Sequence, residues 1–216
     1  MYVMVDNYDS FVYNLAVYLR ELGREVMLVR NDRVSIRMLE LLHRECGLEG
    51  IIISPGPKSP LDCGASGEIV RGMAGRVPIL GVCLGHQIIG HVFGASVKKG
   101  VRPMHGKVTE IRHNRKGLFQ ELPDTYEVTR YHSLIVCEEG LPDCLQVDAR
   151  SSDGTIQAIS HRKLPVYGVQ FHPEAVLTQY GHELLRNFIK ICEEWWKEHE
   201  NKGESFNDLC SAVRVV

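Results

Sequence analysis

The sequence predicts an α/β fold in which a mostly parallel central sheet carries helices on both faces, together with a small antiparallel sheet. Two patterns support this prediction. Over residues 1–95, short apolar runs alternate four times with segments of helical period, and the runs are apolar on both faces, as buried parallel strands are. Beyond residue 95 the chain changes to short segments of alternating polarity between turn signals, which is typical of antiparallel strands.

In the first half of the chain, each predicted strand is followed by a predicted helix. The strands are expected at 2–5, 25–30, 50–54 and 77–82, and the helices at 11–22, 35–42, 66–73 and 86–93. We expect Asp9 or Ser10 to cap the first helix and Ser35 to cap the second, because their side-chain oxygens can accept the free N–H groups of a first turn. Gly23 is expected to end the first helix, because glycine readily adopts a left-handed conformation.

The second half of the chain is expected to contain antiparallel strands, one more buried strand and a terminal helix. The antiparallel strands are expected at 96–99, 107–111, 126–129, 145–149 and 155–159, the buried strand at 165–171 and the helix at 180–196. Residues 1–197 are predicted to form one domain with a sizeable core. The polar residues 198–216 are predicted to form a loose tail, whose last four residues could add an edge strand.

The composition is that of an ordinary globular protein, and it excludes several classes. A net charge of −2 argues against a dedicated nucleic-acid binder, and no apolar run approaches the ~20 residues of a membrane helix. The seven cysteines are scattered and form no C-x-x-C pair, which favours reduced thiols over disulfides or a zinc site. Because the N-terminus runs directly into a strand pattern, no signal peptide is expected, and the predicted location is the cytoplasm.

The segment between the strand at 77–82 and the following helix has the pattern of a nucleophile elbow, with Cys83 between Gly81 and Gly85. So tight a turn needs neighbours without side chains, so that the strand and the helix can pack closely. The helix N-terminus would favour a thiolate, and the backbone N–H of Leu84 could stabilise an oxyanion. A buried structural cysteine is the alternative at this stage.

A candidate base and its orienting carboxylate follow the buried strand at 165–171, where His172 and Glu174 flank Pro173. Catalytic groups gather at the carboxyl ends of strands in open α/β sheets, and Cys83 lies at such an end too. Cys83, His172 and Glu174 therefore form a plausible triad. A half-exposed histidine and a surface glutamate are the alternative, and no further ligands at suitable spacing suggest a metal site.

A rigid loop, Ser54-Pro55-Gly56-Pro57, follows the third predicted strand. Gly56 lies between two prolines, so its N–H is free and no side chain blocks the approach to it. Next to the elbow, this N–H could be the second oxyanion donor beside that of Leu84. A turn that merely ended the strand would need only one proline or glycine.

These three segments together resemble the class I (triad) glutamine amidotransferases: Gly81-Val82-Cys83-Leu84-Gly85-His86-Gln87, Ser54-Pro55-Gly56-Pro57 and Gly168-Val169-Gln170-Phe171-His172-Pro173-Glu174. The resemblance covers roughly residues 1–192 and implies a flavodoxin-like fold. Three further stretches resemble the small subunit shared by anthranilate synthase and aminodeoxychorismate synthase. They are Val5-Asp6-Asn7-Tyr8-Asp9-Ser10-Phe11, Met104-His105-Gly106-Lys107 and Arg130-Tyr131-His132-Ser133-Leu134.

The resemblance implies a glutaminase in which Cys83 attacks the side-chain amide of L-glutamine, His172 transfers protons and Glu174 orients His172. The N–H groups of Gly56 and Leu84 would hold the oxyanion. Glutamine would be bound by Gly56, Gln87, Ser133 and Leu134. This chain would need no cofactor, and the ammonia would pass to a large chorismate-using synthase subunit that depends on Mg²⁺, in a heterodimer or heterotetramer. Both the anthranilate and the aminodeoxychorismate product remain open, with a slight lean towards the latter.

Two loops without evident catalytic logic are expected to face that partner: Asn7, Tyr8, Asp9 and Ser10, and Met104, His105, Gly106 and Lys107. His132 lacks a carboxylate two positions on and is not expected to be the base. The histidines at 43, 113, 161, 182 and 199 are expected to be solvated or on helix surfaces. Lys58 and Cys63 depart from the small residues usual in the family. A stand-alone γ-glutamyl cysteine hydrolase and a catalytically inactive binding domain are the competing hypotheses.

Overall fold

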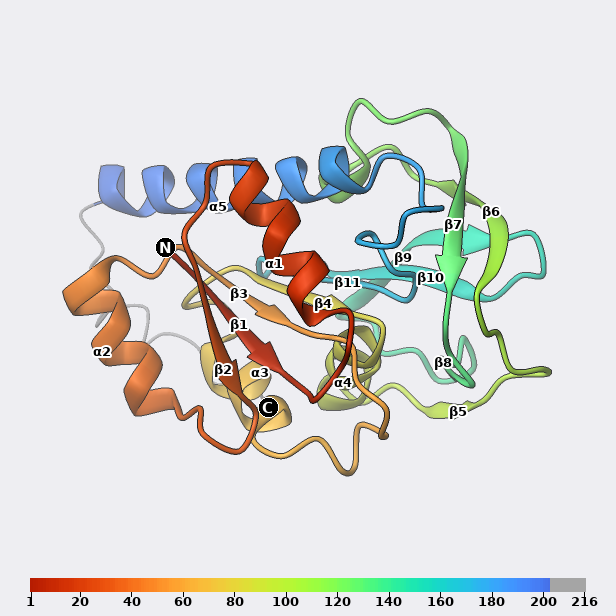
Figure 1. The fold of residues 1–216 in the computed structure, drawn as a ribbon, viewed down its shortest axis with the longest axis horizontal. Coiled ribbons are helices and arrows are strands. Elements are labelled where there is room, and N and C mark those ends of the chain that lie inside the picture. The colour runs from red at the N-terminus through yellow and green to blue at the C-terminus, as the bar shows by residue number, and fades with distance from the viewer. Residues whose placement is uncertain (203–216) are drawn as a thin grey trace.

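A computed structural model describes residues 1–202 of the chain, and in this part a nine-stranded mixed sheet forms the centre of the fold (Figure 1). Five neighbouring strands are parallel, and four antiparallel strands extend the same sheet at one side. The predicted fold class is thus confirmed. The strand order is β2 (Val26–Arg30), β1 (Tyr2–Asp6), β3 (Gly50–Ile53), β4 (Ile79–Val82), β11 (Val166–Val169), β10 (Ile156–His161), β9 (Leu145–Ser151), β6 (Lys107–His113) and β7 (Thr125–Arg130).

A separate two-stranded antiparallel sheet pairs β5 (Val97–Lys99) with β8 (Leu134–Val136). It is smaller than the sequence pattern suggested, because most of the alternating segments after residue 95 join the main sheet instead. The contact between β8 and the helix after the elbow brings residues 133 and 134 towards the carboxyl ends of the parallel strands. This sheet therefore supplies one wall of the candidate site.

Helices cover both faces of the main sheet and divide the core into two parts. The buried side chains of α1 and α5 pack on one face, and those of α3 and α4 pack on the other, with Leu39 of α2. None of the described helices is long and apolar enough to cross a membrane. The helices are α1 (Val12–Glu21), α2 (Ile36–Cys46), α3 (Ser66–Met73), α4 (Leu84–Val92), α5 (Gly181–Lys202) and the short 3-10 helix η1 (Gly117–Phe119).

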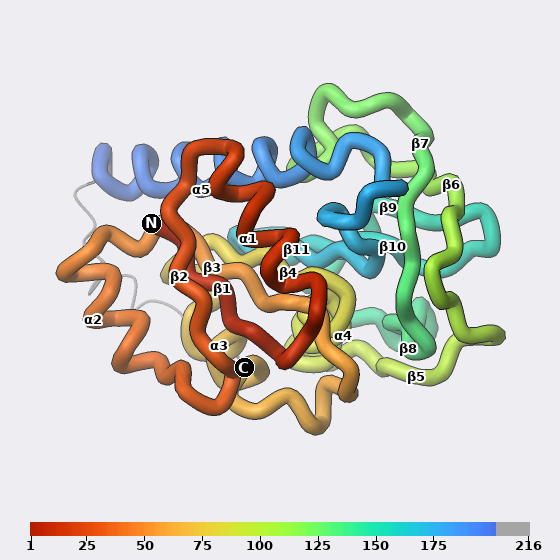
Figure 2. The backbone as a smooth tube through the Cα atoms, viewed as in Figure 1, coloured from red at the N-terminus to blue at the C-terminus, as the bar shows by residue number. Residues whose placement is uncertain are grey.

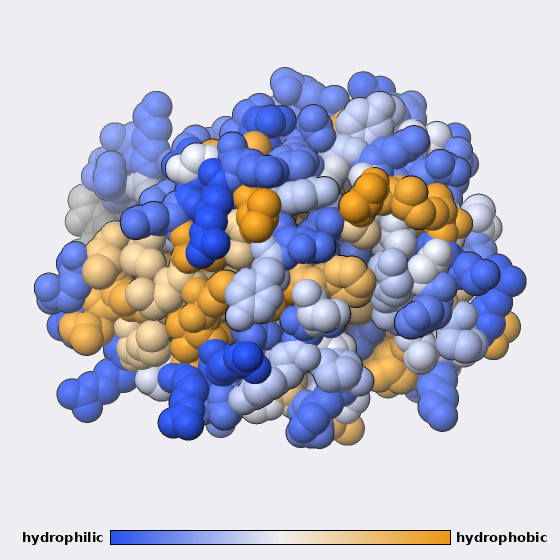
Figure 3. Space-filling model, viewed as in Figure 1, coloured by the Kyte–Doolittle hydropathy of each residue, from blue (hydrophilic) through white to orange (hydrophobic). Residues whose placement is uncertain are grey.

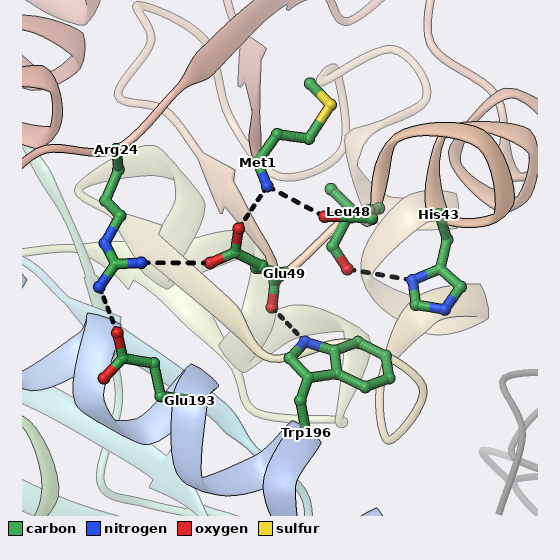
Figure 4. A network of polar contacts seen from close by, with 8 residues as sticks. Met1, Arg24, His43, Leu48, Glu49, Glu193 and Trp196 are labelled. Atoms are coloured by element: carbon green, nitrogen blue, oxygen red, sulfur yellow. Dashed lines mark hydrogen bonds and ion pairs between the residues drawn. The ribbon is translucent and has the colours of Figure 1, made fainter. Parts of the chain in front are cut away.

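The distal half of α5 is held to the amino ends of the parallel strands by polar contacts (Figure 4). Trp196 Nε1 donates to the Glu49 carbonyl at 2.8 Å, and Arg24 pairs with both Glu193 and the Glu49 carboxylate. The helix runs to Lys202 without a break at 197, so it is longer than predicted and includes part of the expected tail. The possible edge strand at 213–216 lies outside the described residues.

Two of the predicted helix-terminal residues, Ser35 and Gly23, are confirmed, and the predicted cap of α1 is wrong. The Ser35 hydroxyl accepts from the Met38 N–H at 3.2 Å, and Gly23 adopts a φ of +78° after α1. Neither Asp9 nor Ser10 caps α1, which begins at Val12. The Asp9 carboxylate accepts instead from the Phe11 N–H at 2.8 Å, before the helix starts.

The prediction of solvated histidines fails at two positions. His113 is buried and stacks on Phe119 with ring centroids 4.7 Å apart. His199 is buried and its Nδ1 bonds to the Trp195 carbonyl at 2.7 Å. Both rings use their apolar faces for packing, which a sequence pattern based on charge does not reveal.

Candidate active site

Cys83 stands at a strained turn between β4 and α4, as the elbow pattern predicts. Its backbone has φ 52° and ψ −98°, a left-handed conformation that is uncommon for a residue with a side chain. A side chain at Gly85 would place its Cβ 2.2 Å from the Ile53 carbonyl oxygen, and one at Gly81 would lie 2.4 Å from the Gly85 backbone. Both glycines are therefore required for α4 to start directly against the sheet. The helix begins at Leu84, two residues earlier than predicted.

The parallel pairing of β4 with β11 explains why residues almost ninety positions apart meet. Gly81 pairs with Gly168 and Val82 with Val169, and the Cys83 N–H donates to the Val169 carbonyl at 2.8 Å. Both strands end at the same edge of the sheet, so the elbow after β4 and the segment after β11 lie side by side. The residues that follow each strand are thereby brought to one site.

His172 and Glu174 form a buried pair beside Cys83. His172 Nδ1 lies 2.7 Å from the Glu174 carboxylate, and both side chains are almost inaccessible to solvent. The carboxylate can only accept, so it fixes the proton on Nδ1 and leaves Nε2 free to act as a base. His172 Nε2 is buried and has no hydrogen-bond partner of normal geometry among the described residues, as in many active sites without substrate.

The charges around His172 favour its protonated form. Burial alone lowers the pKa of His172, but interaction with the Cys83 sulfur and with the Glu174 carboxylate raises it well above the ordinary 6.5. The imidazole is therefore able to hold a proton taken from the thiol. This is the electrostatic relation expected of a base that generates a thiolate.

The loop with Gly56 is pressed against the elbow. A Cβ at Gly56 would lie 2.6 Å from the Leu84 side chain and 2.7 Å from Asn7 Cβ, so only glycine fits at this position. Asn7 fixes the start of the loop, because its Nδ2 donates to the Ser54 carbonyl at 2.9 Å and its backbone N–H donates to the Ser54 hydroxyl at 2.8 Å. The two predicted oxyanion donors thus come from neighbouring, mutually packed segments.

Lys58 and Cys63, which depart from the family pattern, lie in the same loop. Lys58 is exposed and pairs with Asp62 at 2.9 Å. Cys63 is buried, and its thiol donates to the Pro60 carbonyl at 3.1 Å, while its own carbonyl accepts from Asn31 Nδ2 at 3.0 Å. Cys63 therefore anchors the end of the loop.

A cavity of about 320 Å³ opens beside Cys83, and every residue predicted to bind glutamine lines it. This volume lies at the small end of the range for small-molecule sites. Its walls come from the Gly56 loop, the elbow and the segment before β8. The lining residues with a predicted role are Gly56, Cys83, Leu84, Gln87, Ser133 and Leu134.

The backbone at Ser133 and Leu134 is held rigidly by its neighbours. The Leu134 carbonyl accepts from Gln87 Nε2 and from His132 Nδ1, each at 3.0 Å. Arg130 in turn donates to His132 Nε2 at 3.1 Å and pairs with Asp153 at 2.9 Å. Burial and the Arg130 charge lower the pKa of His132 to about 4, so the ring is neutral and orients the Leu134 peptide.

Of the residues predicted to face a partner, two are placed differently. Asn7 and Met104 are buried, with 4% and 6% of their surface exposed, so their side chains do not contribute to an outer surface. Tyr8 and Ser10 in the first loop, and His105, Gly106 and Lys107 in the second, are exposed, while Asp9 is half-buried.

Aromatic rings connect these two loops to the candidate base. Phe11 and Tyr131 each meet the His172 ring edge to face, at centroid distances of 5.7 and 5.1 Å, and lie 5.2 Å from one another. His105 meets the Tyr131 ring edge to face, at a centroid distance of 5.7 Å. In Figure 2 the start of α1, the segment after β7 and the segment after β11 converge at this point. Sequence reasoning did not predict this cluster.

The described residues contain no group of three or more His, Cys, Asp or Glu side chains placed to hold a metal ion. The arrangement instead combines a cysteine elbow on an α/β sheet with a histidine–carboxylate pair and a cavity between them. This combination is characteristic of enzymes that use a cysteine nucleophile in a triad.

Comparison with known proteins makes the assignment specific. The family profile "Glutamine amidotransferase class-I" matches residues 3–192. The chain therefore belongs to the class I glutamine amidotransferases. It is 50% identical over 190 residues to the aminodeoxychorismate/anthranilate synthase component 2 of Bacillus subtilis, covering 88% of this chain and 96% of that protein.

Two further relatives support the same family. The aminodeoxychorismate synthase component 2 of Serratia marcescens is 49% identical over 193 residues, covering 88% of this chain and 99% of that protein. Among solved structures, a putative GMP synthase subunit from Thermoplasma acidophilum superposes with a TM-score of 0.80 at 33% identity, over 92% of this chain and 96% of that one.

Proposed function

We propose that this chain hydrolyses L-glutamine to glutamate and ammonia, with Cys83 as the nucleophile, and delivers the ammonia to a chorismate-using synthase subunit. The observation that carries the proposal is the cavity beside Cys83. The thiol, the two oxyanion donors and the four residues expected to bind glutamine all line it. Family membership and the names of the relatives point to the same chemistry.

The geometry supports a thioester mechanism in two halves. The Cys83 sulfur attacks the side-chain amide carbon of glutamine while His172 Nε2 takes the thiol proton. The N–H groups of Gly56 and Leu84 stabilise the oxyanion, and the collapse of this intermediate breaks the C–N bond as His172 protonates the departing ammonia. Water then attacks the γ-glutamyl thioester with His172 as the base, which releases glutamate and restores the thiol. Glu174 holds His172 in the required tautomer throughout.

In this proposal the chain itself uses no cofactor, and the Mg²⁺ is bound by the partner subunit. The surface near the site supports association with such a subunit. Val176 and Leu177, in the segment between β11 and α5, are 90% and 63% exposed, and Tyr8 and Tyr13 are more than half exposed. Figure 3 shows apolar side chains gathered over that segment, next to the elements that carry the site. Apolar groups exposed together in this way favour a protein interface.

The test replaces Cys83 by serine and uses the exposed Cys46, also changed to serine, as the matched control. We expect Cys83→Ser to abolish glutamine hydrolysis and labelling by a glutamine-analogue electrophile. The synthase partner should still form its product from free ammonia. Cys46→Ser should behave as the parent protein in all three assays.

The same assays decide between the competing hypotheses. Glutamine turnover that persists in Cys83→Ser would refute the mechanism. Strong turnover that no chorismate-using partner increases would favour the stand-alone hydrolase, and no turnover with any partner would favour a binding domain. The product formed with the co-purifying partner, anthranilate or aminodeoxychorismate, assigns the pathway.

A further inference from the structure

Gln170 is a buried polar residue whose side chain reaches the candidate nucleophile. It follows β11 directly, two positions before His172, and has no exposed surface. Its Nε2 lies 3.7 Å from the Cys83 sulfur, and its Oε1 lies 3.2 Å from Gln87 Nε2. Gln170 thus bridges the nucleophile and a residue expected to bind the substrate, although the triad logic assigns it no part.

The orientation of the Gln170 amide follows from its neighbours. The Leu134 carbonyl can only accept, so the Gln87 atom that contacts it at 3.0 Å must be the donor Nε2. The same nitrogen carries a second hydrogen, which points to Gln170 and requires the acceptor Oε1 there. The Gln170 nitrogen must then face Cys83. The sulfur therefore has an N–H donor aimed at it, whose direction is set by a backbone carbonyl.

We propose that Gln170 is a positioning residue for the amidotransferase reaction, which stabilises the Cys83 thiolate and holds Gln87 in its substrate-binding orientation. The proposal rests on the proposed function, because it takes Cys83 as the nucleophile. A hydrogen bond to an ionised sulfur is stronger than one to the neutral thiol, so the donor favours the reactive form. The other end of the amide keeps Gln87 from turning away from the cavity.

Other titratable groups near Cys83 could also affect how its reactivity depends on pH. Burial lowers the pKa of His86 to about 3, and burial with the Arg130 charge lowers that of His132 to about 4, so both rings stay neutral near pH 7. His172 is the titrating partner of the thiol. The titratable or charged groups of the surrounding elements are His86 from α4, Arg130, Tyr131 and His132 from the end of β7, Lys58 from the Gly56 loop, and His172 and Glu174 after β11.

The experiment measures alkylation of Cys83 by iodoacetamide against pH in the full-length protein, resolved by peptide so that other cysteines do not interfere. Gln170→Glu keeps an oxygen for Gln87 but removes the donor to the sulfur. Gln170→Met removes both contacts at similar size. Gln157→Met is the matched control, since the Gln157 side chain is equally buried on the neighbouring strand β10 and donates to the Ser151 hydroxyl. Gln157 contacts Gln170 only through its backbone carbonyl, which accepts from the Gln170 N–H and is kept in the variant.

We expect both Gln170 variants to move the midpoint of Cys83 alkylation up by about one pH unit, which is about a tenfold loss of rate below the midpoint. Gln170→Met should also raise KM for glutamine several-fold, because Gln87 loses its acceptor. Gln157→Met should change neither quantity. If one Gln170 variant does not fold, the other still reports the midpoint.

Two results would overturn the inference: an unchanged midpoint in the folded Gln170 variants, or an equal shift in Gln157→Met, which would indicate general loosening of the sheet. Failure of the proposed function looks different. In that case Cys83 of the parent protein itself would react with iodoacetamide no faster than the buried Cys63.

Discussion

The contact between Gly85 and β3 gives the sharpest test of how the elbow is built. An alanine at Gly85 would place its Cβ 2.2 Å from the Ile53 carbonyl oxygen, whereas real contacts of this kind stay above 3.0 Å. The start of α4 must therefore move by at least 0.8 Å, the difference between these two values. The obstacle is backbone in the middle of the sheet, so it cannot turn aside as a flexible side chain would.

Two opposing effects set the magnitude. Alanine is better than glycine in a helix by up to about 1 kcal/mol, whereas overpacking against a rigid neighbour costs about 3 kcal/mol. The clash wins, and we expect Gly85→Ala to lower the free energy of unfolding by about 2 kcal/mol. A displacement of roughly 1 Å at a reacting group can cost about 100-fold in rate, so glutamine turnover should fall by roughly 10- to 100-fold.

Gly67→Ala in α3 is the control. Its Cβ would meet only side chains, the nearest being the Cys63 sulfur at 3.7 Å, which is an ordinary contact. This variant should match or exceed the stability of the parent protein and keep its activity. Urea unfolding and a glutaminase assay on the three proteins give the comparison. Equal stability of Gly85→Ala and Gly67→Ala would refute the account of the elbow.

Two further substitutions test the electrostatics. Glu174→Gln removes one of the groups that raise the pKa of His172, so the midpoint of the His172 titration in NMR should fall. A raised pKa stabilises the folded protein below the ordinary pKa of about 6.5, and this stabilisation is lost as pH rises through the pKa of the folded state. The stability lost by this variant should therefore be larger at pH 6 than at high pH, and a loss that grew with pH would contradict the assignment. Asp153→Asn leaves the buried Arg130 guanidinium without its carboxylate and should cost about 2 kcal/mol at pH 7, below the usual figure for a fully buried pair because Asp153 is a third exposed. Burial raises the pKa of Asp153, but hydrogen bonds from Ser151, Thr155 and Arg130 outweigh burial and hold the pKa below its ordinary value. The stability difference should therefore begin to shrink as pH falls below about 4 and disappear once pH falls through the lower pKa of the folded state, and a difference that persisted beyond that in acid unfolding would argue against the ion pair.

The sequence was sufficient to predict the central features of the fold and candidate site, because both depend on local pattern. The alternation of apolar runs with helical segments predicts the parallel strands. The glycines around Cys83 and Gly56 mark close approaches that the structure confirms. His172 and Glu174 are two residues apart on one segment, so their hydrogen bond needed no knowledge of long-range pairing.

What the sequence did not reveal depends on contacts between distant segments. Asn7 looks like a loop residue, yet its partners Ser54, Asn31 and Ser66 lie 24 to 59 positions away, and these bonds bury it. The link from Asp153 through Arg130 to the Leu134 carbonyl requires β6 to pair with both β7 and β9, which no local pattern specifies. Gln170 offered one signal, a polar side chain at the end of an otherwise apolar strand.

The rings around His172 also give this protein a natural spectroscopic reporter. Phe11 and Tyr131 both lie within ring-current range of the imidazole, so its carbon-bound protons should resonate apart from those of the nine other histidines. His105 extends the same cluster of rings to the surface. If a second protein docked at that surface and moved these rings, a single resolved proton signal at the candidate base would change.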